Sequence, residues 1–206
     1  MRTRIKICGL TREADIDAAV AAGADALGFV LWPGSERAID PDRLAQLAAR
    51  VPAFVARVGL FVDQDPEFVR RCAPYLDLIQ FHGDEPPEAC RQAPRAWIKA
   101  LRMRESIDLH AAAEAYREAR ALLLDAYRPG VPGGTGEVFD WSRIPASLAK
   151  PVILAGGLTP DNVGEAVRRV RPFAVDVSGG VEATRGIKDP AKLRAFIEHV
   201  NLTPES

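Results

Sequence analysis

Eight short apolar segments recur at regular intervals along the chain, and this repetition restricts the fold more than any other feature. The segments are rich in Val, Ile and Leu and do not alternate with polar residues, as is typical of strands covered on both faces. They span residues 4–8, 25–31, 54–62, 76–82, 96–101, 121–127, 151–157 and 173–179. Strands separated by helices form parallel sheets. Eight such units predict an α/β fold, a (β/α)8 TIM barrel that forms a single domain over residues 1–206.

Each predicted strand is followed by a helix candidate. Among these helical segments are residues 12–24, 41–51, 66–75, 85–94, 106–119, 159–170 and 190–200. The segment 85–94 is short and weak, whereas four others have a proline near their start, where a missing N–H costs little. The alternative is an open doubly wound sheet. It is disfavoured because it would need eight strands in a short chain, and no G-x-G-x-x-G follows the first strand.

The composition argues against several classes of protein. The formal net charge is −1 and no basic cluster stands out, so nucleic acid is not expected as a partner. No apolar run approaches the roughly 18 residues that span a bilayer, and the N-terminal segment lacks the long apolar stretch of a secretory signal. Cys8, Cys72 and Cys90 have no C-x-x-C spacing, which disfavours a disulfide framework or zinc site. We therefore expect a cytoplasmic protein without membrane association.

In such a barrel, the active site lies at the carboxyl ends of the strands and in the loops that follow them. Cys8, His82, Asp125 and Asp176 stand at or near these ends, and Arg37 lies in the long loop after the second strand. A carboxylate at the end of an apolar strand must face an open site or be paired, which makes Asp125 and Asp176 candidates. His82 has either a structural or a direct role. Arg37 is either a solvated charge or a clamp for a carboxylate.

Two pairs of glycines follow the last two predicted strands. Gly156 and Gly157 end the seventh segment, and Gly179 and Gly180 come after Ser178 at the end of the eighth. Barrels that bind phosphate commonly use these two loops, because glycine lets backbone N–H groups approach the anion closely. The alternative is that the glycines merely form tight turns. Their presence in both loops favours a phosphate site.

The loop after the sixth strand, residues 128–141, is long and contains four glycines and two prolines. Such a length exceeds what a plain connection needs and is typical of a mobile lid over an active site. The alternative is a surface loop without a role. We expect a lid, because Asp125 stands at the root of this loop.

Cys8 differs from the other two cysteines in its position. Those two fall in predicted helices and are expected to pack as small apolar side chains. Cys8 ends the first strand, with Lys6 on the same face. Lys6 either lowers the pKa of the thiol or pairs with Asp176, and the sequence leaves both open. A thiol and the Asp125 carboxyl at a barrel mouth suit acid–base chemistry on a small sugar phosphate, without a metal or other cofactor.

Several stretches of the chain resemble phosphoribosylanthranilate isomerases of tryptophan biosynthesis. The matching stretches are KICGLT, ADALGFV, LIQFHGDE, LLLDAY with GGTGEVFDW, LAGGLTPDNV, and AVDVSGGVE with GIKD. They occur in order over nearly the whole chain. The resemblance implies an Amadori rearrangement, in which the aminoaldose N-(5-phosphoribosyl)anthranilate becomes an aminoketose, a 1-deoxyribulose 5-phosphate.

The resemblance also implies residue roles. Cys8 would be the general base and Asp125 the general acid. Arg37 would hold the anthranilate carboxylate, the glycine loops after the last two strands would hold the phosphate, and we expect His82 and Asp176 to contact the substrate. The expected partner is this small molecule, and the sequence leaves monomer and homodimer open.

The chain departs from the family pattern at two positions. Glu36 stands where the family usually has proline, and Gly179 stands where it usually has a second serine. One alternative is the related aminoaldose isomerase of histidine biosynthesis, or a barrel that serves both pathways. Those proteins use a carboxylate in place of Cys8 and a substrate with two phosphates. A non-catalytic metabolite-binding barrel is a further alternative, but it would not need both Cys8 and Asp125.

Overall fold

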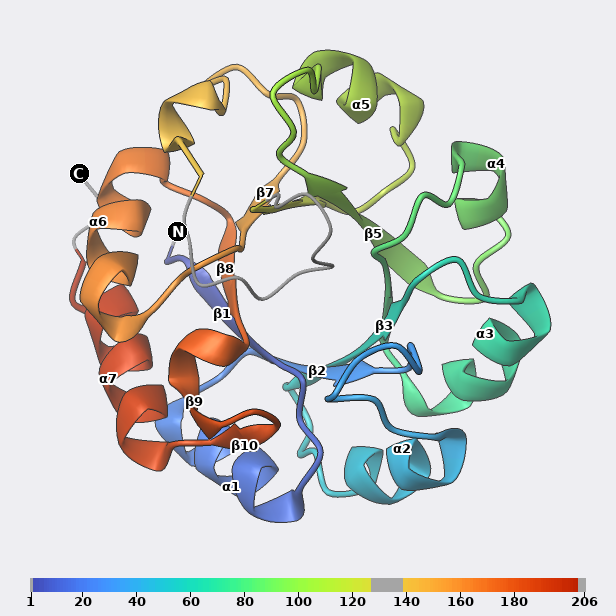
Figure 1. The fold of residues 1–206 in the computed structure, drawn as a ribbon, viewed down its shortest axis with the longest axis vertical. Coiled ribbons are helices and arrows are strands. Elements are labelled where there is room, and N and C mark those ends of the chain that lie inside the picture. Colours follow the sequence, from blue (N-terminus) through green and yellow to red (C-terminus); the bar gives the residue numbers. More distant parts are fainter. Residues whose placement is uncertain (1, 127–138, 204–206) are drawn as a thin grey trace.

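The computed structural model describes residues 2–126 and 139–203, and it confirms the predicted barrel. Eight parallel strands pair in chain order, and β8 closes the ring against β1 (Figure 1). The strands are β1 (Arg4–Cys8), β2 (Ala26–Val30), β3 (Ala56–Phe61), β4 (Leu78–Phe81), β5 (Ala96–Arg102), β6 (Leu122–Asp125), β7 (Val152–Leu154) and β8 (Ala174–Val177). Because all eight run in the same direction, their carboxyl ends meet at one rim of the barrel.

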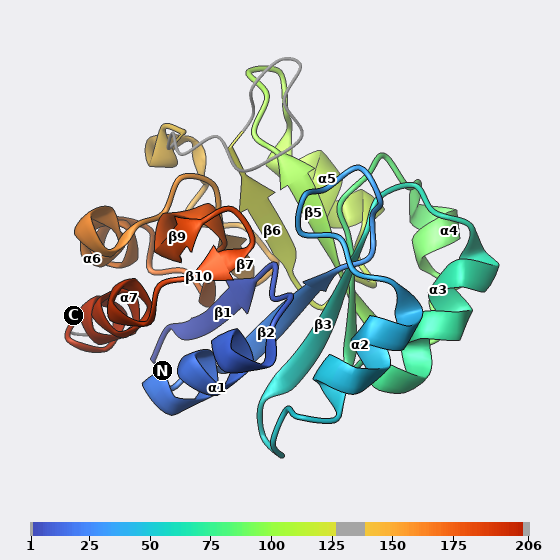
Figure 2. The same cartoon turned by 60° about the horizontal axis from the view of Figure 1, so that its bottom comes forward.

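Helices surround the barrel and cover the outer face of the strands (Figures 1 and 2). They are α1 (Glu13–Ala22), α2 (Pro41–Ala48), α3 (Pro66–Cys72), α4 (Pro87–Cys90), α5 (Leu109–Ala115), α6 (Pro160–Val170) and α7 (Pro190–Asn201). Their starts follow the sequence signals. In α2, α3 and α7, an aspartate caps the first backbone N–H groups and a proline occupies the first turn.

The structure differs from the expectation of eight simple strand–helix units in two places. After β6, the described residues contain a single turn of 3-10 helix, η2 (Trp141–Arg143), in place of an α-helix. After β8, the chain forms a 3-10 turn, η3 (Gly179–Val181), and then a short antiparallel hairpin of β9 (Glu182–Thr184) and β10 (Ile187–Lys188). The hairpin strands are too short to produce a recognisable periodicity, so the sequence did not reveal them.

Two apolar regions lie on either side of the strands. One fills the layer between strands and helices and includes Ile5 and Ile7 of β1. The other fills the interior and includes Leu123 of β6 and Ala174 of β8. Successive side chains of a strand point to opposite faces. Lys6 and Cys8, which follow Ile5 and Ile7, therefore point into the barrel. Asp125 and Asp176, two positions beyond Leu123 and Ala174, do the same. This alternation turns the candidate site residues of β1, β6 and β8 toward the interior.

Within the described part of the chain, none of the helices has both the length and the hydropathy that crossing a membrane requires.

Candidate active site

Cys8 and Lys6 project from β1 into the barrel beside Asp176 of β8. Lys6 and Asp176 are register partners, and Lys6 Nζ donates to Asp176 Oδ1 at 2.8 Å. A Cβ atom added to Gly28 on β2 would lie 2.7 Å from Cys8 Sγ and 3.0 Å from Lys6 Nζ. The ends of both side chains therefore converge over Gly28, where a larger residue would displace them. The sequence left open whether Lys6 pairs with Asp176 or lowers the pKa of the Cys8 thiol. The structure shows the pair with Asp176, and the charge of Lys6 also acts to lower the pKa of the thiol.

The charges around Cys8 act on its pKa in opposite directions. Burial raises the pKa of the thiol above its ordinary value, and the charge of Asp176 raises it further. The charges of Lys6 and Lys188 and a hydrogen bond from Lys6 pull it down. Burial also opposes the charge on Lys6, but Asp176 and Cys8 outweigh this effect and raise the pKa of Lys6. Lys6 therefore stays protonated at neutral pH and favours the thiolate.

Asp125 ends β6 and is linked to His82, which directly follows β4. His82 Nε2 lies 3.2 Å from Asp125 Oδ2, and His82 Nδ1 lies 2.9 Å from Gln80 Nε2. The two ring nitrogens of His82 thus bridge the Gln80 amide and the Asp125 carboxyl. The sequence left open whether His82 has a structural or a direct role. The structure places His82 in contact with Asp125, the candidate acid. Asp125 is buried except for about a tenth of its side chain, as expected of a group at the rim.

The glycine loops after β7 and β8 touch one another. A Cβ atom added to Gly180 would lie 1.9 Å from the carbonyl oxygen of Leu158, so only glycine fits at this contact. Gly157 precedes α6, and Gly179 begins η3. The two predicted phosphate-binding segments, Gly156–Gly157 and Ser178–Gly180, therefore lie close to one another at the rim. The residues that would form the lid lie mostly outside the described part of the chain.

Arg37 reaches from the loop after β2 to this surface. A Cβ atom added to Gly9 would lie 2.5 Å from Arg37 Cδ, and a Cβ atom added to Gly179 would lie 3.6 Å from Arg37 Nη2. Its guanidinium binds both carboxylate oxygens of Glu182 in β9. Glu36, which stands where the family usually has proline, forms an exposed ion pair with Arg185 at 2.7 Å. This pair ties the Arg37 loop to the β9–β10 hairpin.

The sequence did not identify several residues that take part in this arrangement. Glu182 and Lys188 carry no strand-end signal of their own, because they belong to the unpredicted hairpin. Gln80 lies inside β4, where its polarity in a buried strand was the available signal. Lys99 of β5 donates to Glu85 Oε2 and to the carbonyl oxygen of Gly83, each at 2.7 Å. The positive charge of Lys99 is thus paired with Glu85 inside the protein.

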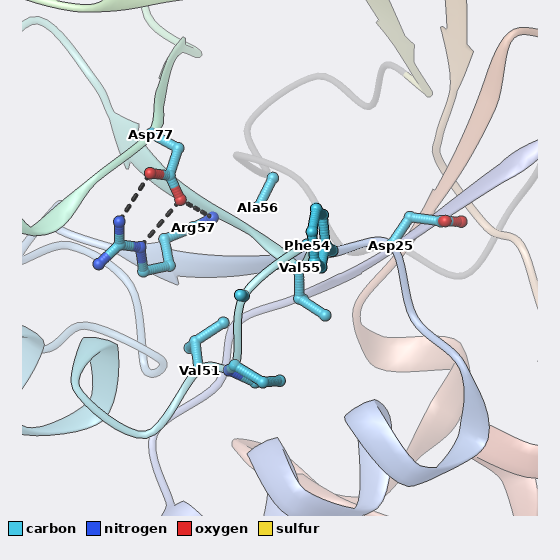
Figure 3. A pocket seen from close by; sticks show the side chains of 9 residues that line it. Asp25, Val51, Phe54, Val55, Ala56, Arg57 and Asp77 are labelled. Carbon is cyan, nitrogen blue, oxygen red and sulfur yellow. Dashed lines mark hydrogen bonds and ion pairs between the residues drawn. The ribbon is translucent and has the colours of Figure 1, made fainter.

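A cavity lies at the other end of the barrel (Figure 3). It has a volume of about 450 Å³ and is lined by residues that precede or begin strands, among them Asp25, Ala56 and Asp77. Phe54 beside it is fully exposed. None of the candidate catalytic residues lines this cavity, so we place no chemistry there. Within residues 2–126 and 139–203, no three His, Cys, Asp or Glu side chains are grouped so that they could hold a metal ion.

Similarity to known sequences covers almost the whole chain. A family model described as N-(5'phosphoribosyl)anthranilate (PRA) isomerase matches residues 5–199. The N-(5'-phosphoribosyl)anthranilate isomerase of Chromohalobacter salexigens is 74% identical over 202 residues, which cover 98% of this chain and 96% of that protein. The protein of the same name from Dechloromonas aromatica is 55% identical over 208 residues and matches over the full length of both chains.

Solved structures give the same result. The crystal structure of phosphoribosyl anthranilate isomerase from Thermotoga maritima superposes with a TM-score of 0.90 at 42% identity, covering 97% of this chain and 98% of that one. A crystal structure of a phosphoribosyl anthranilate isomerase in complex with reduced 1-(o-carboxyphenylamino)-1-deoxyribulose 5-phosphate has a TM-score of 0.86 at 40% identity, covering 97% of this chain and 98% of that one.

Proposed function

The chain belongs to the N-(5'-phosphoribosyl)anthranilate isomerase family, and we propose that it performs this isomerisation with Cys8 as general base and Asp125 as general acid. It is an isomerase of tryptophan biosynthesis and converts the aminoaldose into the aminoketose. The observation that supports these two roles is that both side chains lie at the carboxyl-end rim, on strands separated by β7 and β8. An acid and a base on either side of one small sugar meet the needs of the reaction.

The reaction begins at the ring oxygen of the ribose. Protonated Asp125 donates its proton to that oxygen while the bond from the oxygen to C1′ breaks, which leaves an iminium ion between C1′ and the anthranilate nitrogen. Cys8 then removes the proton from C2′, and the electron pair of that bond neutralises the iminium to give an enolamine. Tautomerisation of the enolamine gives the ketone at C2′. Overall, C2′ is oxidised and C1′ is reduced, so the rearrangement needs no cofactor.

The thiol is suited to the second proton transfer because the iminium makes the C2′ proton acidic. A base of modest strength is then sufficient. Although burial raises the pKa of Cys8, Lys6 and Lys188 favour its thiolate. His82 would lie beside the general acid during the reaction, since its Nε2 contacts Asp125. Desolvation by the bound sugar strengthens these electrostatic interactions.

The remaining predicted roles concern binding. We assign the phosphate to the backbone N–H groups of Gly156, Gly157, Gly179 and Gly180 and to Ser178, and the anthranilate carboxylate to Arg37. Asp176 is held by Lys6, and we assign it to the inner wall of the substrate site. Three free, buried cysteines are consistent with a reducing compartment, and we propose the cytoplasm.

Loss of the fluorescence of N-(5-phosphoribosyl)anthranilate on addition of the protein tests the function. We expect rapid decay that depends on protein concentration. Absence of decay would contradict the assignment. Comparable turnover of the two-phosphate aminoaldose of histidine biosynthesis would support the dual-function alternative, which the presence of a cysteine at position 8 disfavours.

A further inference from the structure

Two buried charged residues near the mouth of the barrel neither bind the substrate nor transfer a proton in the mechanism above. Glu182 lies in β9 and Lys188 in β10, and the register of the hairpin sets them opposite one another. Lys188 Nζ lies 2.9 Å from Glu182 Oε1, and their side chains are 0% and 5% exposed. Burying two charges is costly unless they are paired and hydrogen-bonded further. Their presence here therefore requires an explanation.

Both carboxylate oxygens of Glu182 accept hydrogen bonds from Arg37. Arg37 Nε donates to Oε1 and Arg37 Nη2 donates to Oε2, each at 2.7 Å. Two parallel bonds between a planar guanidinium and a carboxylate fix the orientation of the guanidinium as well as its position. The pair uses two of the five N–H donors of Arg37. Among the described residues, the edge formed by Nη1 and the second N–H of Nη2 has no acceptor, which leaves it for another carboxylate.

Lys188 in turn fixes Glu182. Its Nζ also donates to the carbonyl oxygen of Ser178 at 3.0 Å, and its backbone N–H donates to Asp15 at 3.3 Å. Burial alone would raise the pKa of Glu182, but the hydrogen bonds from Arg37 and the charge of Lys188 outweigh it and lower that pKa. Glu182 is therefore ionised at neutral pH and holds both cations.

We propose that Glu182 and Lys188 are positioning residues of the isomerase: Lys188 holds Glu182, and Glu182 holds Arg37 with its free edge toward the anthranilate carboxylate. The proposal rests on the proposed function, because it gives Arg37 a carboxylate ligand. The two residues act on the substrate through Arg37. Removing them should therefore weaken binding of a carboxylate-bearing ligand while Arg37 is present, and should have little effect once Arg37 is gone.

A double-mutant cycle of Glu182→Gln and Arg37→Ala tests this. Glutamine replaces one oxygen with an NH₂ group that faces an N–H of Arg37, so one of the two bonds is lost. We expect Glu182→Gln alone to raise KM for N-(5-phosphoribosyl)anthranilate about five- to thirty-fold, with kcat changed less than about three-fold. In the Arg37→Ala background, the same change should alter KM less than about two-fold.

Two further measurements separate positioning from general damage. Glu182→Gln should weaken binding of reduced 1-(o-carboxyphenylamino)-1-deoxyribulose 5-phosphate but leave unchanged the affinity for its counterpart that carries aniline in place of anthranilate. Glu13→Gln is the matched control, because Glu13 forms a similar two-bond pair with Arg43 on the exterior. It should change neither affinity.

Thermal unfolding establishes that each variant is folded. If Glu182→Gln is unfolded, Glu182→Asp enters the same cycle, because it keeps the charge but withdraws the carboxylate by one methylene. Additive effects of the two substitutions, or equal loss of both ligands, would overturn the positioning role. If the wild type converts the substrate while the cycle is additive, the proposed function stands and this inference fails. If the wild type does not convert the substrate, both fail.

Discussion

The two ends of the barrel use charged residues in different ways. At the carboxyl-end rim, the pair of Lys6 and Asp176 is almost buried, with side chains 5% and 9% exposed. At the amino end, Arg57 and Asp77 form a pair whose side chains are 32% and 44% exposed (Figure 3). Exposed pairs contribute roughly 0–1 kcal/mol to stability, whereas buried pairs carry a desolvation cost that function can justify. The buried pair therefore lies at the end where we propose the chemistry, and the exposed pair lies at the end where we propose none.

The largest expected difference between the ends concerns catalysis. Asp125→Asn removes the proton that the ring oxygen must receive and should lower kcat by about 10² to 10⁴. Asp77→Asn makes the same chemical change at the other end and should leave kcat unchanged. Steady-state kinetics with N-(5-phosphoribosyl)anthranilate measures both. Equal kcat values for the two variants would remove Asp125 from the mechanism.

The second difference concerns stability. Lys6→Met leaves the Asp176 carboxylate buried without its cation, so the free energy of unfolding should fall by about 3–5 kcal/mol. Arg57→Met breaks an exposed pair and should reduce it by less than about 1 kcal/mol. Urea unfolding compares the two variants. A loss below about 1 kcal/mol for Lys6→Met would mean that solvent or another cation compensates at the rim.

A smaller effect is expected for substrate binding. Arg37→Ala should weaken binding of N-(5-phosphoribosyl)anthranilate by about 1.5–3 kcal/mol, the range for a charge-assisted hydrogen bond. Arg43→Ala, which removes an arginine from the exterior, is the matched control and should leave KM as it is. An unchanged KM and kcat in Arg37→Ala would show that this arginine only anchors Glu182.

The smallest effect is the pH dependence of the exposed pair at the amino end. Hydrogen bonds from Arg57 lower the pKa of Asp77. Because the folded-state pKa lies below the unfolded value, the contribution of the pair is present above the unfolded pKa and is lost as the pH falls through the folded one. The difference in unfolding free energy between wild type and Asp77→Asn should thus be less than about 1 kcal/mol at pH 7, begin to decline below about pH 4, and vanish only below the lowered folded-state pKa of Asp77. A difference that grows on acidification would contradict this sign.

The sequence predicted the strands of the barrel well because each is a short segment rich in Val, Ile, Leu and Ala. It also indicated which side chains stand at the rim, since Cys8, Asp125 and Asp176 are polar or reactive residues at the ends of such runs. Their convergence follows from parallel strands, and no further information was needed. The partner of Lys6 could not be chosen, because it depends on the register between β1 and β8, which joins residues far apart in the chain.

The β9–β10 hairpin was not predicted, and with it the surroundings of Arg37 were missed. Two strands of three and two residues have no measurable period, and their sequence reads as part of a loop. Glu182 and Lys188 were therefore given no role from the sequence. The expected helix after β6 was wrong for a related reason, because the described residues there form one turn around Trp141 that buries its ring without a helical repeat.

The central claim is that the Cys8 thiolate at the rim takes the C2′ proton. It is tested most directly by the kcat of Cys8→Ser, followed by the fluorescence of N-(5-phosphoribosyl)anthranilate. A hydroxyl has almost the same shape as a thiol but is a far weaker base, so kcat should fall by about 10² to 10⁴, nearly as far as in Cys8→Ala, while the thermal unfolding temperature changes little. Full activity of Cys8→Ser would contradict this mechanism, and the proton would then have to leave by another route, with His82 as the first candidate to test.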